Sequence, residues 1–262
     1  MECSVCSEFC YPDPGNKKQR LLSCKKRTYR DRHNPHGLSS FNIVVEETDL
    51  WISAQAYLER EATEIVLDMR HQIKSYIYLH PEFLSSLVPV KPDCHAPDVV
   101  KEMIDASTRA NVGPMASVAG AIAQGVGRAL LGVSEEIIVE NGGDIFLSTY
   151  RPATVSVFAG SSPFSGKLAL VIPTRQMPVG VCSSSATVGH SLSMGITDVT
   201  CVISKDTALA DAAATALGNR VRCLADLAHL GRWADEIGDI IGGVVIVRGH
   251  MAAWGDIELS EV

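Results

Sequence analysis

The feature that most constrains the fold is a succession of strand-like apolar runs in the second half of the chain. Two of them, 137–140 and 145–150, flank the tetrapeptide Asn141-Gly142-Gly143-Asp144. Asn-Gly between apolar runs is a strong β-hairpin signal because both residues accept positive φ angles. Most strands follow one another without a helix between them, which favours antiparallel pairing. The chain is therefore predicted to be an α+β protein with largely antiparallel sheets and packed helices. The further strands are predicted at 154–159, 167–172, 199–204, 243–247 and 254–259, and 41–53 is predicted to be extended or a hairpin.

Helical periodicity marks the elements that pack on these sheets. Apolar residues recur three and four apart from Leu58 to Ile77, which predicts an amphipathic helix that ends before Pro81. Further helices are predicted from Pro97 onward and over 113–131, 207–217 and 224–236. The helix at 113–131 is rich in small residues, which allow another backbone to approach closely.

The first 27 residues differ from the rest because they hold four of the eight cysteines and little apolar periodicity. Residues 1–27 are predicted to be a cysteine-rich tail, and residues 28–262 the folded domain. The tail leaves two alternatives open, a zinc or iron–sulfur site and a segment without fixed structure. The ligands of such a site would be Cys3, Cys6, Cys10 and Cys24.

Charge and hydropathy exclude several classes of partner. The formal charge of −7 argues against a nucleic-acid surface, which needs a basic field. No uninterrupted apolar run reaches the roughly 18 residues that cross a bilayer, and no apolar core of a secretory signal opens the chain. We therefore expect a cytoplasmic protein whose cysteines are thiols or metal ligands. Exposed strand edges and the small-residue helix permit a homodimer.

The turn at Asn141, Gly142, Gly143 and Asp144 has two interpretations. It is a tight hairpin turn by its residue types alone. It is also suited to a ligand, because glycines let backbone N–H groups approach a phosphate without interference from a Cβ. The Asp144 carboxylate would then bind a hydroxyl, a ring nitrogen or a cation.

A second polar segment runs from Gly180 to Gly195 and is either a solvated loop or an anion site. Its hydroxyls and glycine amides suit a phosphate, and the relevant residues are Ser183, Ser184, Ser185, Thr187 and Gly189. Two side chains in it are candidates for catalysis. His190 is a candidate general base, and Cys182 is a candidate reactive thiol if the loop lowers its pKa. The alternatives are a structural histidine and a buried cysteine.

A third motif lies on the predicted helix that begins near Thr207. Asp211 and Thr215 are four residues apart, so they share one helix face among alanines and leucines. A carboxylate and a hydroxyl in this arrangement can provide half of a Mg²⁺ site, because Mg²⁺ takes oxygen ligands. The alternative is that Asp211 hydrogen-bonds an adjoining loop.

Together these motifs resemble the ApbE-like superfamily, whose best-known members are FAD:protein FMN transferases. The segments "VENGGDIFL" and "ADAAATALGN" are similar to its Asn-x-Gly-Gly-Asp and Ala-Asp-Ala-x-Ala-Thr motifs. The resemblance is closer to one branch, uncharacterised protein family 0280, through "ETDLWI", "YIYLHPEF", "VGPMASVAGAIA" and "SSSATVGHSLSMG". It covers about Tyr29 to Leu259, so it implies an ApbE-like fold for that whole span.

The resemblance implies that Asp211 and Thr215 bind Mg²⁺ and that FAD or FMN lies against Gly142, Gly143 and Asp144. Two departures leave FMN transfer open. The transferases' His-x-x-Asp-Pro-x-Thr-Gly stretch is reduced to His190 and Gly195, and their Lys-Gly-Tyr helix lacks its lysine here. The same branch is associated with sulfur assimilation in anaerobes. The alternative function is therefore a sulfur-handling factor that carries a persulfide on Cys182.

Overall fold

The centre of the molecule is an eight-stranded sheet in which every neighbouring pair of strands is antiparallel. The computed structural model describes residues 37–185 and 195–262, and Gly37–Val262 form one compact unit. The tail at 1–27 with its four cysteines lies outside the described residues. The strand order is β1 (Ser39–Val45), β2 (Thr48–Ala54), β3 (Ile137–Asn141), β4 (Asp144–Ser148), β7 (Val179–Ser184), β8 (Val199–Ser204), β9 (Ile240–Val247) and β10 (His250–Gly255).

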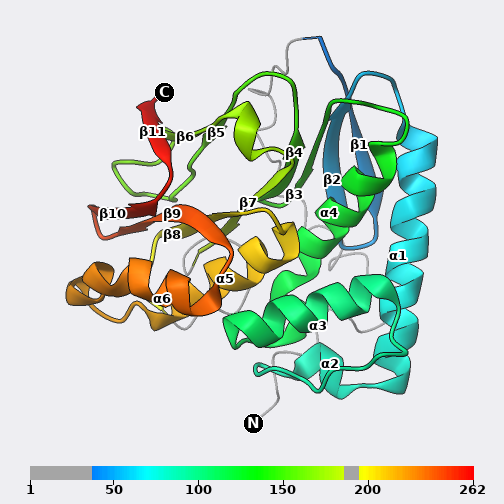
Figure 1. The fold of residues 1–262 in the computed structure, drawn as a ribbon, viewed down its shortest axis with the longest axis horizontal. Coiled ribbons are helices and arrows are strands. Elements are labelled where there is room, and N and C mark those ends of the chain that lie inside the picture. The colour runs from blue at the N-terminus through cyan, green and yellow to red at the C-terminus, as the bar shows by residue number, and fades with distance from the viewer. Residues whose placement is uncertain (1–36, 186–194) are drawn as a thin grey trace, which may run out of the picture. The chain divides into compact units, whose positions relative to one another are not determined.

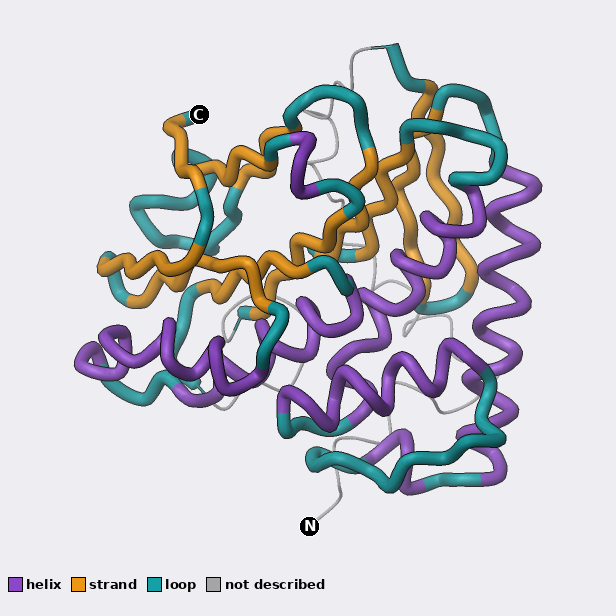
Figure 2. The backbone as a smooth tube through the Cα atoms, viewed as in Figure 1, coloured by secondary structure: helices purple, strands orange, loops and turns teal. Residues whose placement is uncertain are grey.

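Helices cover one face of this sheet, and a second, three-stranded sheet covers part of the other (Figures 1 and 2). The smaller sheet has the order β11 (Glu258–Glu261), β6 (Leu168–Ile172), β5 (Ala153–Ser156), and its pairs are also antiparallel. The α+β prediction is thus confirmed. The helices are α1 (Glu59–Leu79), α2 (Glu82–Ser85), α3 (Asp98–Ala110), α4 (Val118–Leu130), α5 (Thr207–Arg220) and α6 (Leu230–Ile237), with 3₁₀ turns at Pro114–Ser117, Thr174–Gln176 and Leu224–His229.

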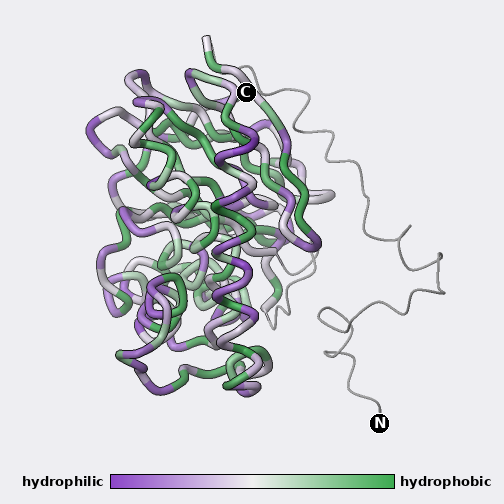
Figure 3. Tube along the Cα trace, turned by 90° about the vertical axis from the view of Figure 1, so that its right-hand side faces the viewer, coloured by the Kyte–Doolittle hydropathy of each residue, from purple (hydrophilic) through white to green (hydrophobic). Residues whose placement is uncertain are grey.

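Strand alternation divides the apolar core between the two faces of the large sheet. Phe146 of β4 faces the helices, whereas its neighbours Ile145 and Leu147 face the smaller sheet. Hydrophobic and hydrophilic positions accordingly alternate along the chain (Figure 3). The packing against α4 is close, because a Cβ on Gly127 would lie 2.2 Å from the Phe146 ring. No helix in the described part of the chain is long and apolar enough to cross a membrane.

Two predicted boundaries were wrong. The segment 180–184, which was interpreted as part of a polar loop, is strand β7 in the middle of the sheet. Val179 and Val181 of this strand are buried against the smaller sheet. Two alternating apolar residues are too few to predict a strand from the sequence. The single strand predicted at 254–259 is two strands in different sheets. Gly255 has a φ of 79°, and the chain turns there from β10 to β11.

Candidate functional site

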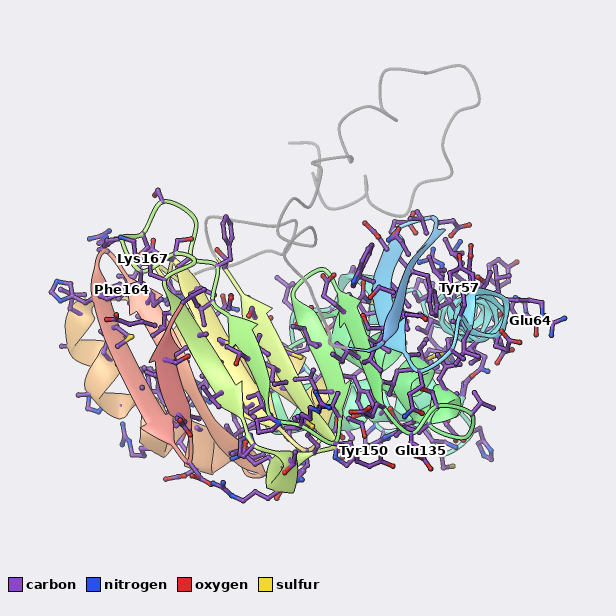
Figure 4. The ribbon with its side chains drawn as sticks, turned by 90° about the horizontal axis from the view of Figure 1, so that it is seen from above. Tyr57, Glu64, Glu135, Tyr150, Phe164 and Lys167 are labelled. Carbon is purple, nitrogen blue, oxygen red and sulfur yellow. The ribbon has the colours of Figure 1, made fainter. Side chains whose placement is uncertain are left out.

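The β3–β4 hairpin has the tight turn that its residue types predict. Asn141 pairs with Asp144, and the two glycines between them have φ angles of 70° and 118°. The Gly143 N–H donates to Glu140 Oε1 at 3.1 Å. One amide that was expected to face a ligand is therefore occupied by the chain's own carboxylate. At the other end of the hairpin, the Tyr150 hydroxyl donates to Glu135 Oε2 at 3.0 Å (Figure 4).

The Asn141 side chain connects the hairpin to α4. It is buried, and its Nδ2 donates to the Ala119 carbonyl oxygen at 3.1 Å. That carbonyl belongs to the first turn of α4, so the hairpin and the helix are held in register next to the turn. The amide thus has a structural partner, and ligand contact by Asn141 stays a prediction.

Replacing Asn141 by alanine is expected to lower the free energy of unfolding by about 1–2 kcal/mol, because the Ala119 carbonyl loses its donor in a poorly hydrated place. Urea denaturation measures this change. The matched control is Asn42→Ala, since the amide of Asn42 also makes hydrogen bonds but is exposed. The control should lose less than about 0.5 kcal/mol. Equal losses in both variants would contradict the role given to the Asn141 contact.

Asp144 lies on the helix-facing side of β4, next to the end of β7. Strand alternation puts it on the same face as Phe146, and its side chain is buried. Its Oδ1 accepts a hydrogen bond from the Ser183 backbone N–H at 3.3 Å. The hairpin motif and the serine-rich segment are therefore brought together through a carboxylate and a backbone amide.

Asp211 reaches the same place from α5. Its Oδ2 accepts a hydrogen bond from the Gly120 N–H at 2.9 Å, at the N-terminal turn of α4. The side chain is only 9% exposed. Burial raises the pKa of Asp211 well above its usual value, and the negative charge of Asp144 raises it further. The amides of Gly120 and Ala119 act in the opposite direction. Two carboxylates that are remote in sequence thus share one poorly hydrated region.

Cys182 lies beside this acid pair, by which we mean Asp144 and Asp211. Its thiol is fully buried and donates to the Thr207 carbonyl oxygen at 3.3 Å. Burial raises the pKa of Cys182 well above its usual value, and the charges of Asp144 and Asp211 add to this effect. A reactive thiol needs a lowered pKa, so this direction favours the alternative interpretation of Cys182 as a buried cysteine. Cys182 is a neutral thiol with a structural hydrogen bond.

Some of the remaining predicted residues lie within the described part of the chain and some lie outside it. Ser183 and Ser184 end β7, and Ser185 Oγ donates to the Asp198 carbonyl oxygen at 2.6 Å. Thr215 is half-buried one turn after Asp211 on α5. Thr187, Gly189 and His190 lie outside the described residues, so His190 stays a prediction.

Sequence reasoning missed two contributors to the site. Glu140 is 1% exposed and holds the glycine turn through the Gly143 amide. Gly120 holds Asp211 and has no room for a Cβ, which would lie 2.4 Å from the Thr207 carbonyl oxygen. The small residues of 113–131 predicted close packing. They did not predict that the Gly120 amide would bind the carboxylate of Asp211.

The acid pair offers carboxylate oxygens, which are ligands that hard cations take. Within residues 37–185 and 195–262, no group of three or more His, Cys, Asp and Glu side chains is placed to hold a metal. The acid pair supplies two carboxylates instead. Mg²⁺ requires only one or two carboxylates, because it keeps several of its waters or takes substrate phosphates.

Comparisons with known proteins identify the family and the fold. A family model described as "AbpE bacteria" matches residues 30–236. The UPF0280 protein of Methanocella arvoryzae is 41% identical over 212 residues, which cover 80% of this chain and 86% of the relative. The UPF0280 protein of Methanospirillum hungatei is 44% identical over 219 residues, which cover 82% and 87%.

Solved structures share the fold at low sequence identity. The flavin transferase ApbE of Vibrio cholerae, as a point mutant, has a TM-score of 0.54 at 12% identity and covers 84% of this chain and 97% of its own. The ApbE protein of Thermotoga maritima has a TM-score of 0.52 at 13% identity and covers 85% and 97%. The family model, the relatives and the shared architecture confirm the resemblance seen in the motifs. The chain therefore belongs to the "AbpE bacteria" family, among the UPF0280 proteins, and has the fold of the ApbE flavin transferases.

Proposed function

We propose that this protein binds a flavin nucleotide together with Mg²⁺ at the acid pair. The observation that carries the proposal is that two buried carboxylates, Asp144 and Asp211, come together in a fold shared with proteins named flavin transferases. The mutual repulsion of the two carboxylates, which raises the pKa of Asp211, favours a divalent cation between them. The hydroxyl of Thr215, one helical turn from Asp211, is a further oxygen ligand.

Mg²⁺ would offset the negative charge of a bound pyrophosphate. The chain's own residues have separate tasks. The Gly120 amide orients Asp211, the Ser183 amide orients Asp144, and Glu140 fixes the turn against which the flavin would lie. The Ser184 hydroxyl, Thr187 and the Gly189 amide stay the predicted phosphate contacts. The Ser183 hydroxyl instead interacts with Cys201 on the face of the smaller sheet, and Ser185 Oγ already donates to the Asp198 carbonyl oxygen. His190 is the predicted general base.

This function accounts for the site better than sulfur transfer does. A persulfide forms on a thiolate that a sulfur donor can reach, and Cys182 is neither ionised nor exposed. A nucleotide with a divalent cation instead uses the two carboxylates that the fold brings together. The structural neighbours are named flavin transferases, so FMN transfer to a protein hydroxyl, which the family resemblance implies, is the reaction to assay first.

Titration with FAD, followed by flavin fluorescence, tests the proposal. Saturable binding is expected in millimolar MgCl₂ and should weaken at least tenfold in EDTA, because the uncompensated carboxylates then repel the pyrophosphate. Riboflavin, which has no phosphate, should bind weakly and without Mg²⁺ dependence. Equal binding of FAD in MgCl₂ and EDTA, or equal binding of riboflavin and FAD, would refute the proposal. Release of AMP in the same mixture distinguishes a transferase from a protein that only binds flavin.

A further inference from the structure

A cavity lies where β8 ends and β9 begins, beyond the end of β7 that is remote from the acid pair. In the β7–β8 pairing, Ser184 is opposite Thr200 and Gly180 is opposite Ser204. Lys205 directly follows β8, so it lies next to the Gly180 end of β7. The contact between Ser183 and Asp144 is at the other end of that strand. The cavity has a volume of about 480 Å³. Its lining consists of Arg109, Arg128, Lys205, Asp206, Asp239, Ile240 and Ile241.

Three cationic side chains from three separate elements line this cavity. Arg109 comes from the last turn of α3, Arg128 from the last turn of α4, and Lys205 from the connection between β8 and α5. With Asp206 and Asp239 in the same lining, three cations against two carboxylates leave a formal charge of +1, in a chain whose formal charge is −7. All three cationic side chains are at least partly exposed, so the packing of the strands and helices does not require them.

The three cations keep donors for a ligand. Lys205 Nζ donates to the Gln176 carbonyl oxygen at 2.6 Å, and no carboxylate of the described residues forms an ion pair with it. Arg128 uses its NH1 group on Glu102, at 3.1 Å. Arg109 uses its NH2 group on the Gly238 carbonyl and on Asp239. A guanidinium has five N–H donors, so Arg128 can still bind an oxyanion in two-pronged geometry through Nε and NH2. Arg109 keeps single donors on Nε and on NH1, which lies 4.0 Å from Asp105 Oδ2.

The two carboxylates of the lining are already compensated. Asp206 Oδ1 accepts the Leu209 N–H at 3.0 Å as the N-cap of α5, and Asp239 is paired with Arg109. One member of each pair is well exposed, Asp239 at 78% and Arg128 at 50%, so solvent screens both pairs and each contributes only modestly to stability. A multiply charged oxyanion can therefore compete for both arginines at low cost.

We propose that this cavity binds a small phosphorylated metabolite, with the phosphate on Arg109, Arg128 and Lys205. The volume lies in the range of small-molecule pockets and exceeds what a phosphate alone needs. Ile240 and Ile241 offer an apolar wall for the carbon skeleton. This site is independent of the acid pair and of the flavin function proposed for it.

Calorimetric titration of the full chain with inorganic phosphate, pyrophosphate and glycerol 3-phosphate tests the inference. EDTA is present throughout, so that binding with Mg²⁺ at the acid pair does not contribute. Saturable binding is expected at low ionic strength, and it should be tightest for glycerol 3-phosphate if the apolar wall takes part. Lys205→Gln should weaken binding about tenfold, because a charge-assisted hydrogen bond is lost. The control Lys101→Gln, on the exposed side of α3, should stay within twofold.

Three outcomes would overturn the inference. These are the absence of saturable binding for all three ligands, unchanged affinity in Lys205→Gln, and an equal loss in Lys101→Gln. Should Lys205→Gln fail to fold by circular dichroism, Arg128→Gln decides in its place, because the Arg128 side chain is 50% exposed and contributes little to folding. Tighter binding of pyrophosphate or phosphate than of the phosphate ester would identify a free inorganic anion as the natural occupant.

Discussion

Asp211→Asn is expected to abolish Mg²⁺-dependent flavin binding and, at the same time, to stabilise the protein in the absence of metal. The asparagine oxygen can still accept the Gly120 N–H, so the local fold is kept. The variant lacks the negative charge that the cation requires. We expect the affinity for FAD in MgCl₂ to fall at least a hundredfold, to the level measured for the wild type in EDTA.

The stability change follows from the direction of the pKa shift. The pKa of Asp211 is higher in the folded than in the unfolded protein, so its contribution is most favourable below the unfolded value, near 3.8. That contribution is lost as the pH rises through the folded pKa. Asparagine has no charge to bury, so the variant does not lose this stability as the pH rises. At pH 7–8 in EDTA its melting temperature should be a few degrees above that of the wild type, since 1 kcal/mol corresponds to about 2–4 °C.

The control for both effects is Asp235→Asn, which removes an exposed carboxylate on α6. It should change neither FAD binding nor the melting temperature by more than the error of measurement. A wild-type response to MgCl₂ in Asp211→Asn would refute the role of this carboxylate. A lower melting temperature of the variant at pH 8 would show instead that the charge of Asp211 stabilises the metal-free fold.

Gly120→Ala is expected to destabilise the protein by about 2–3 kcal/mol and to weaken flavin binding together with it. The new methyl group would lie 2.4 Å from the Thr207 carbonyl oxygen and 2.8 Å from Asp211 Cβ, so α4 and α5 must separate. Separation lengthens the hydrogen bond that orients Asp211. Chemical denaturation and FAD titration measure the two effects.

Gly132→Ala is the matched control, because the same methyl group there would lie at an ordinary 3.6 Å from the Ala129 carbonyl oxygen. We expect it to be neutral or slightly stabilising, as alanine reduces the entropy of the unfolded chain. If both glycine variants lose the same stability, the close contact between α4 and α5 is not the cause.

Much of the fold was predictable because local patterns and tertiary contacts agree. The apolar stripe from Leu58 to Ile77 became the buried face of α1, and the Asn-Gly signal became the β3–β4 turn. Strand β7 was not predictable from its own residues. The residue types of Cys182 and Ser183 indicate a polar segment. The segment is a strand because it pairs with β4 on one side and with β8 on the other.

The site was predictable in its parts and not in its connections. Asp144 and Asp211 were named from their motifs, and the structure brings them together. Their orienting groups, the amides of Gly120 and Ser183, carry no signal in the sequence because every residue except proline has such an amide. The reversed pKa direction of Cys182 likewise depends on which carboxylates the fold places beside it.

The depth of the acid pair has a kinetic consequence. Asp144 is 7% exposed and Asp211 is 9% exposed, so the oxygens that would bind the proposed Mg²⁺ have little contact with solvent. Under the proposed function, entry of the hydrated ion would require a transient local opening, and that opening rather than diffusion would set the rate of loading. We expect the metal, once captured, to exchange slowly, so that brief dilution into chelator leaves it in place while prolonged dialysis removes it.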